Sequence, residues 1–148
     1  MGGHSYSYFV PYQTDHQVAL DALREREFRA GRYSPVLRFI EFSEPGFFAQ
    51  NPGAQHASIH GAVKAAGEDG TRSILDISTV ADEPGYSVAA PLDDDEMDDF
   101  FGTAQPSRDD VEKSDAFFGA IDRGQCRYVV LYKNGQPNEL FFAGYSFD

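Results

Sequence analysis

The sequence predicts an α+β fold: a mixed, mostly antiparallel sheet of about five strands, with helices on one face and a C-terminal β-hairpin. Two observations predict it. In some segments every second residue is apolar, as in strands, and in others the apolar residues have helical spacing. Predicted strands and predicted helices come in groups along the chain and do not strictly alternate. Between the last two apolar segments stands Asn134-Gly135, a strong signal for a tight hairpin turn. The 148 residues match the usual size of one domain, so a single domain over residues 1–148 is expected.

The first third of the chain predicts a strand, a helix and an irregular loop. Tyrosine and valine alternate with serine over residues 5–10, and Pro11 ends this strand. A helix is expected from a capping box at Thr14 to Ala30, with Gly31 as its stop. Prolines and glycines interrupt residues 32–56, within which residues 36–42 form a candidate short strand. Irregular stretches of this length within one domain are often functional.

The remaining elements are expected in the following order. A short helix follows its cap at Ser58, and strands follow over residues 73–80 and 86–90. The helix over residues 93–101 has the clearest signals, because Asp93 and Glu96 form a capping box and Gly102 follows it. Another helical segment runs over residues 107–124. The hairpin strands cover residues 126–133 and 140–147, and Pro137 leaves open a loop longer than two residues.

The net charge of −12 is concentrated in one segment. Between Asp82 and Asp115 there are 12 carboxylates, opposed only by Arg108 and Lys113, which gives this segment a charge of −10. Such a balance argues against a nucleic-acid partner, which requires a basic surface. The apolar stretches are too short to cross a membrane. No signal peptide is expected at the start, and the single cysteine excludes an intrachain disulfide, so a cytoplasmic setting is predicted.

Helix stability explains only part of this charge. Carboxylates in the first turn, such as Asp94 and Asp95, favourably oppose the helix dipole. Asp98 and Asp99 lie in the second turn, where they repeat those charges at i,i+4 spacing and cost a few tenths of a kcal/mol per pair. The interpretations are a solvated face, a docking face for a basic protein, and a divalent-cation site. No calcium-binding loop motif is present, so no metal site is assigned.

The leading hypothesis is a protein-binding module, of which an inhibitor or an immunity-type protein is one form. It docks a basic protein partner through an acidic helical face. The predicted binding residues are Asp94, Asp95, Asp98, Asp99, Asp109, Asp110, Glu112, Phe100 and Phe101. Phe117 and Phe118 are further candidate apolar anchors. No cofactor is predicted.

The alternative hypothesis is a small enzyme with an unrecognised site around His56, His60 and Cys126, to which Arg72 and Asp76 are candidate additions. The i,i+4 spacing of the histidines lacks the glutamate of a metalloprotease motif. A buried, inert thiol is the favoured interpretation of Cys126. The question of enzymatic activity therefore stays open, leaning towards none, and no catalytic residue is assigned.

A third hypothesis is self-association into a homo-oligomer. Phe47 and Phe48 in the irregular loop, together with a tyrosine-rich sheet, supply the candidate interface. The tyrosines are expected mainly in the core, with an interface role left open. They are Tyr6, Tyr8, Tyr128, Tyr132 and Tyr145.

Three segments carry a resemblance to other proteins. They are Tyr8-Phe9-Val10-Pro11-Tyr12-Gln13, Gly70-Thr71-Arg72-Ser73-Ile74-Leu75-Asp76-Ile77 and Phe141-Phe142-Ala143-Gly144-Tyr145-Ser146-Phe147-Asp148. They resemble phrases from small, stand-alone bacterial proteins of uncharacterised function. The resemblance implies no activity, cofactor or catalytic residue.

Overall fold

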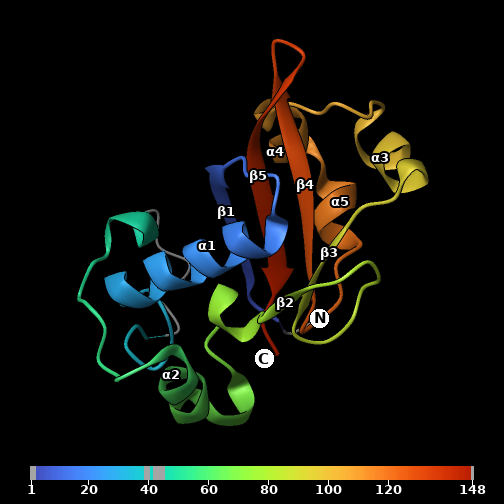
Figure 1. The fold of residues 1–148 in the computed structure, drawn as a ribbon. Helices are drawn as coiled ribbons and strands as arrows, with labels where there is room; N and C mark the ends of the chain where they lie inside the picture. The colour runs from blue at the N-terminus through green and yellow to red at the C-terminus, as the bar shows by residue number, and fades with distance from the viewer. Residues whose placement is uncertain (1–2, 39–40, 42–45, 148) are drawn as a thin grey trace.

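A computed structural model describes residues 3–38, 41 and 46–147 of the chain. Five strands form one sheet in the order β1-β5-β4-β3-β2 (Figure 1). The long pairings of β5 with β1 and β4 are antiparallel, and the short pairings of β3 with β4 and β2 are parallel. The predicted α+β class and mixed, mostly antiparallel sheet are confirmed. The strands are β1 (Ser5–Pro11), β2 (Thr79–Val80), β3 (Val88–Pro91), β4 (Cys126–Lys133) and β5 (Gln136–Tyr145).

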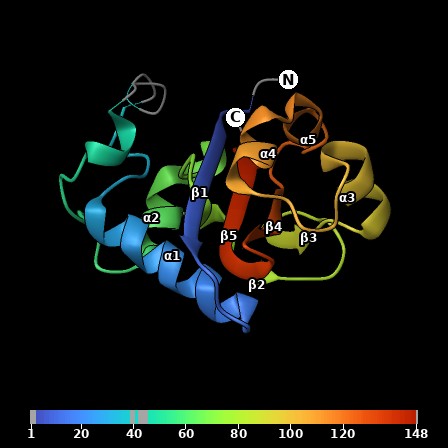
Figure 2. The ribbon, with the colours of Figure 1, turned by 90° about the horizontal axis from the view of Figure 1, so that it is seen from above.

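Helices cover both faces of this sheet, whereas the sequence predicted helices on one face only (Figure 2). We call α1 and α2 with their connections the α1 layer, and the helices of the opposite face the α3–α5 layer. The helices are α1 (His16–Ala30), α2 (Ile59–Ala66), α3 (Asp94–Phe101), α4 (Arg108–Lys113) and α5 (Asp115–Gly119).

The reason for two covered faces lies in the hairpin strands, which are apolar on both sides. Tyr128 and Phe142 belong to the core under the α1 layer, while their neighbours Val129 and Phe141 belong to the core under the α3–α5 layer. A strand buried on both faces needs a helical layer on each. Of the five tyrosines that the sequence placed on strands, three are buried and two are partly exposed. Those buried are Tyr6, Tyr8 and Tyr128, and those partly exposed are Tyr132 and Tyr145.

Helix α1 begins and ends close to the predicted residues. Its N-cap is Asp15, one residue after Thr14, and the Asp15 carboxylate accepts a hydrogen bond from the backbone of Val18. Gly31 ends the helix in the left-handed region at φ 78°. A Cβ at Gly31 would collide with the backbone of Gly53, whose N–H donates to the helix carbonyl of Ala30 at 3.0 Å. The irregular loop therefore packs directly against the C-terminus of α1.

The predicted strand over residues 73–80 is wrong for most of its length. A 3-10 turn, η4 (Ile74–Asp76), replaces it, and only β2 remains extended. Ser73 caps this turn by accepting from Leu75, and the carboxylate of Asp76 accepts from the backbone of Thr71 at 2.9 Å. Serine and aspartate thus provide hydrogen bonds that compete with a strand, despite the apolar residues between them.

Within the described part of the irregular loop lies a 3-10 turn, η2 (Phe47–Ala49), and η3 (Gly67–Asp69) follows α2. Phe47 is buried in the core, whereas Phe48 is 58% exposed. The predicted short strand over residues 36–42 is absent at residues 36–38. Its residues 39, 40 and 42 lie outside the described part of the chain.

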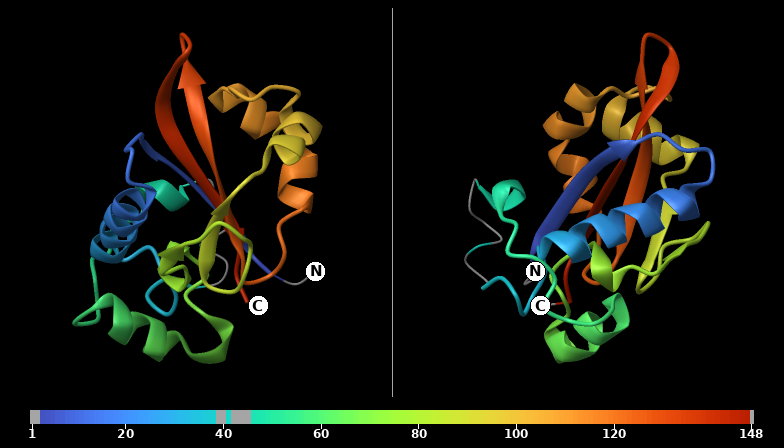
Figure 3. Two further views of the ribbon diagram at one scale, coloured as in Figure 1. Left: turned by 45° about the vertical axis from the view of Figure 1, so that its right-hand side comes forward. Right: turned by 60° about the vertical axis from the view of Figure 1, so that its left-hand side comes forward.

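The helical segment predicted over residues 107–124 divides into α4 and α5. Ser114 ends the first and caps the second, where its hydroxyl accepts from the backbone of Phe117 and donates to the carbonyl of Phe100. The hairpin loop has two residues, Asn134 and Gly135, both at positive φ. The register shift that accommodates Pro137 occurs in the paired strands beyond this turn. Figure 3 shows α3, α4 and α5 along one side of the hairpin.

Candidate functional site

The two phenylalanines of α3 attach the helix to the core. Phe100 and Phe101 are half-buried, with ring centroids 6.0 and 5.6 Å from the ring of the fully buried Phe117. Phe118 is also half-buried, against Phe141. These aromatic side chains explain how the acidic helices are held, and only their exposed edges face solvent.

Glu96 and Arg127 tie α3 to the sheet. The two carboxylate oxygens of Glu96 accept hydrogen bonds from the Arg127 guanidinium at 3.0 and 2.7 Å, and Arg127 also donates to the carbonyls of Ala90 and Pro91. Hydrogen bonds from Arg127 lower the pKa of Glu96 below its ordinary value, against the opposing effect of burial. Glu96 also completes the predicted capping box with Asp93, which is confirmed. The position of α3 is therefore fixed at its first turn.

Most of the predicted acidic residues form no side-chain hydrogen bond or ion pair within the described part of the chain. Asp110 is the exception, because its carboxylate accepts from the backbone of Ser107 at 2.8 Å and so caps α4. The other six are exposed, and their side chains form no hydrogen bond or ion pair with any described residue. They are Asp94, Asp95, Asp98, Asp99, Asp109 and Glu112.

Three adjoining shallow concavities, the first of them almost completely open to solvent, lie between the beginnings of α1 and α3. The first, of about 620 Å³, and the second, of about 200 Å³, share His16 and Tyr128. The third, of about 230 Å³, shares Asp82 with the first and Pro91 with the second. We call the three together the acidic groove. It lies where the parallel strands β2 and β3 end, a common location for ligand sites in sheets with parallel strands.

Hydrogen bonding and charge define the chemistry of this groove. His16 Nδ1 and the Tyr128 hydroxyl share a hydrogen bond of 2.9 Å. Burial raises the pKa of Tyr128 above its ordinary value, and the negative charge of Asp82 raises it further. Glu83 and Asp94 also line the groove. No sequence motif indicated His16 or Tyr128, because 112 positions separate them and only the packing of α1 against the sheet brings them together.

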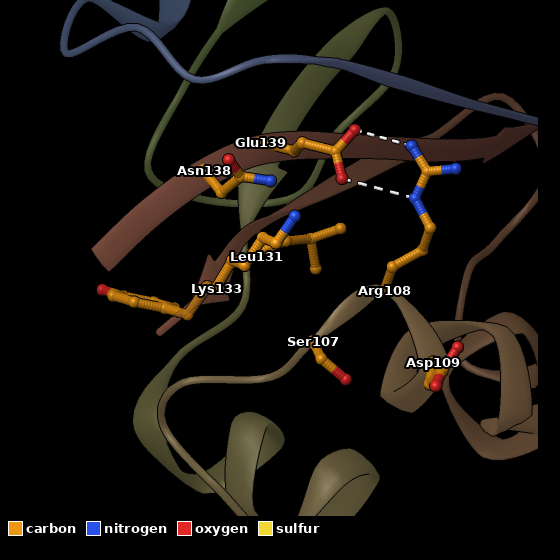
Figure 4. A pocket seen from close by; sticks show the side chains of 8 residues that line it. Ser107, Arg108, Asp109, Leu131, Lys133, Asn138 and Glu139 are labelled. Atoms are coloured by element: carbon orange, nitrogen blue, oxygen red, sulfur yellow. Dashed lines mark hydrogen bonds and ion pairs between the residues drawn. The ribbon is translucent and has the colours of Figure 1, made fainter. Parts of the chain in front are cut away.

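A separate pocket of about 440 Å³ lies between the start of α4 and the hairpin (Figure 4). The guanidinium of Arg108 donates to both carboxylate oxygens of Glu139, at 2.6 and 3.3 Å, and lies 3.9 Å above the ring of Phe9. Lys133 and Asp109 also line the pocket, so its charges balance. This arrangement connects α4 to the sheet.

The residues of the enzyme hypothesis lie elsewhere. Cys126 is fully buried in β4, and burial raises the pKa of its thiol, which keeps it protonated at neutral pH. His56 shares a hydrogen bond of 2.8 Å with the Tyr33 hydroxyl, while His60 is exposed on α2. Arg72 and Asp76 belong to the turn before β2. None of these residues lines the acidic groove or the pocket beside α4.

Comparisons with known proteins give no family. No family model matches the chain, and neither the curated proteins nor the solved structures contain a match. Within the described residues, no group of three histidine, cysteine or carboxylate side chains is arranged to hold a metal ion. None of the helices in the described ranges combines the length and apolarity needed to cross a membrane.

Proposed function

We propose that this chain is a protein-binding module that docks a basic protein partner through the acidic face of α3 and α4. The observation that carries the proposal is the set of six exposed carboxylates on these helices whose side chains form no hydrogen bond or ion pair with any described residue. Three of them, Asp98, Asp99 and Glu112, also lie beyond the first helical turn, where the helix dipole does not favour them. Such charge of one sign accelerates association with a partner of opposite sign. An inhibitor or immunity-type protein is the form of this function in which the basic partner is an enzyme or a toxin.

Two features of the helices support docking over simple solvation. Asp94 and Asp98, and likewise Asp95 and Asp99, are like-charge pairs at i,i+4 spacing, which a basic partner would relieve. The helices are also held rigidly, by the bonds of Arg127 to Glu96 and of Ser114 to the carbonyl of Phe100. A rigid surface loses little conformational entropy on binding.

A binding assay with defined basic proteins tests this proposal. Immobilised protein is presented with basic probes such as a lysozyme and a histone at about 20 and about 300 mM salt, which changes the screening length severalfold. We expect binding at low salt that is weakened about tenfold or more by the double variant Asp98→Asn, Asp99→Asn.

The matched control removes two charges from the other side of the molecule. Glu68 and Asp69 are exposed in η3, so Glu68→Gln with Asp69→Asn changes the net charge equally. We expect this control to weaken binding much less. Equal weakening by both double variants would mean that only net charge matters, and absence of binding at low salt would refute the proposal.

A further inference from the structure

Helix α3 lies at the margin of the molecule, and its two ends are attached in different ways (Figure 1). At the C-terminal end, Phe100 and Phe101 pack on a buried ring of α5, and the Ser114 hydroxyl donates to the carbonyl of Phe100. Apolar contacts have no fixed direction, and one hydroxyl bond lets a helix pivot about it. At the first turn, the Arg127 guanidinium donates to both carboxylate oxygens of Glu96, which fixes a direction.

The side chain of Arg127 joins three elements of the fold. It extends from β4 and is only 7% exposed. At the end of β3 it donates to the carbonyls of Ala90 and Pro91, at 3.3 and 2.9 Å, and in α3 it reaches Glu96. Only two residues separate β3 from α3. The guanidinium therefore holds both ends of this short connection and sets the direction in which α3 leaves the sheet.

Arg127 stands at a position of β4 where the pattern of the strand favours an apolar residue. Arg127, Val129 and Leu131 are alternate residues and lie on one face of the sheet, and the latter two belong to the core under the α3–α5 layer. Replacing both partners of a buried ion pair by apolar residues is often neutral for stability or even favourable. Stability alone therefore does not account for the pair of Arg127 and Glu96, whereas a defined orientation of α3 does.

We propose that Arg127 is the positioning residue of the docking face, because it holds α3 in the orientation in which the exposed carboxylates of the helix meet the basic partner together. This inference rests on the proposed function and names what controls the affinity of that same surface. The four aspartates of α3 all lie within three residues of Glu96, so their direction depends on the bonds of Glu96. Without those bonds, the partner would have to order α3 as it binds, and that ordering lowers the affinity.

The test uses two substitutions of Arg127 that leave every carboxylate of the docking face in place. Arg127→Met removes the guanidinium and makes the net charge more negative by one. Arg127→Lys keeps the net charge, but an ammonium group lacks the planar fork that serves Glu96 and both carbonyls together. The control Leu23→Ala opens a cavity in the core under α1, on the other face of the sheet. Thermal unfolding confirms that each variant is folded at the temperature of the assay.

The affinity for a basic probe, a lysozyme, is measured at about 20 mM salt, where screening is weak. If net charge alone set the affinity, Arg127→Met would bind this probe more tightly than the wild type does. We expect the opposite, with binding about fivefold weaker for Arg127→Met and for Arg127→Lys. Leu23→Ala should lose stability and keep its affinity.

A double-mutant cycle separates positioning from a loss of stability. Asp98→Asn with Asp99→Asn is introduced into the wild type, into Arg127→Met and into Leu23→Ala. Removing these carboxylates should cost less affinity in Arg127→Met than in the wild type, because there they no longer meet the partner together. The cost should be unchanged in Leu23→Ala. If Arg127→Met does not fold, Arg127→Lys takes its place in the same cycle.

Two kinds of result would overturn the inference. If Asp98→Asn with Asp99→Asn weakens binding but the Arg127 variants bind as tightly as the wild type, or the cycle shows equal costs, the docking face stands and Arg127 does not position it. If the wild type binds no basic protein at low salt, the proposed function itself fails, and the inference fails with it.

Discussion

The two helical layers of this protein use charge in opposite ways. In the α1 layer, the carboxylate of Glu27 is completely buried and accepts hydrogen bonds from Arg26 and Arg32. Asp76 is likewise buried and accepts from the backbone and hydroxyl of Thr71. In the α3–α5 layer, most carboxylates are exposed and unpaired within the described residues.

This difference separates charges that the fold requires from charges that it does not. A buried charge is tolerated only when it is paired or hydrogen-bonded, so the buried carboxylates of the α1 layer, Glu27 and Asp76, are part of the structure. An exposed carboxylate without a partner leaves stability nearly unchanged when it is removed. The second group is therefore where a function can act at little cost to the fold, with Asp93, Glu96 and Asp110 as the structural exceptions.

The largest expected effect comes from removing the buried charge of the α1 layer. Glu27→Gln should destabilise the protein by about 3–5 kcal/mol, because Arg32 loses its partner inside a largely buried site. The control Glu25→Gln breaks the exposed pair with Arg29 and should cost less than about 0.5 kcal/mol. Urea unfolding of both variants at neutral pH measures the difference. Similar stabilities would contradict the distinction between the layers.

Loss of the ion pair between Glu96 and Arg127 in the α3–α5 layer should have the next largest effect on stability. Arg127→Met removes the charged hydrogen bonds to Glu96 and should cost about 2–3 kcal/mol at neutral pH. The pKa of Glu96 is lowered in the folded protein, so its stabilisation is present above the unfolded pKa of about 4.3 and is lost as the pH falls below it. The gap in unfolding free energy between wild type and variant should therefore narrow at acid pH. If the difference in unfolding free energy between wild type and variant did not change with pH, Glu96 would make no contribution to it.

Asp76 should show the opposite pH dependence. Burial raises its folded pKa despite the hydrogen bonds from Thr71. The folded state thus binds the proton more tightly, and stability falls as the pH rises from about 3.9, the unfolded pKa, to the raised folded pKa, with a limiting slope of about 1.4 kcal/mol for each pH unit between them. Asp76→Asn, which stays neutral, should lack this fall. Urea unfolding over a pH series tests the sign, and an increase of wild-type stability relative to the variant across this range would contradict it.

The sequence predicted the fold best where its signals were local. The caps of α1 and α3, the Asn134-Gly135 turn and the strand pattern of β1 each depend on neighbouring residues, and all were close to the observed elements. The segment over residues 73–80 failed because hydrogen bonds of Ser73 and Asp76 overrode its apolar pattern. The second helical layer was missed because continuous apolar strands do not reveal which helices cover each face.

For the candidate site, sequence found the charge but not the cavity. Counting carboxylates located the acidic helices, since charge density needs no knowledge of contacts. It did not show that Asp110 is a cap, or that Phe100 and Phe101 pack on Phe117. The sequence did not predict the groove, because the groove forms only where α1, the β2–β3 connection and β4 meet in space.

The smallest expected effect tests the unused charge of the α3–α5 layer directly. Asp98→Asn with Asp99→Asn removes two like-charge repulsions at i,i+4 spacing, so the protein should become more stable by a few tenths of a kcal/mol. The gain should shrink with added salt, which screens exposed charges. Thermal unfolding at low and high salt measures both. A loss of more than about 1 kcal/mol would place these carboxylates among the charges that the fold requires. The same variant is expected to lower the affinity for a basic partner. A gain in stability together with a loss of affinity would therefore show that these two residues serve binding and not the fold.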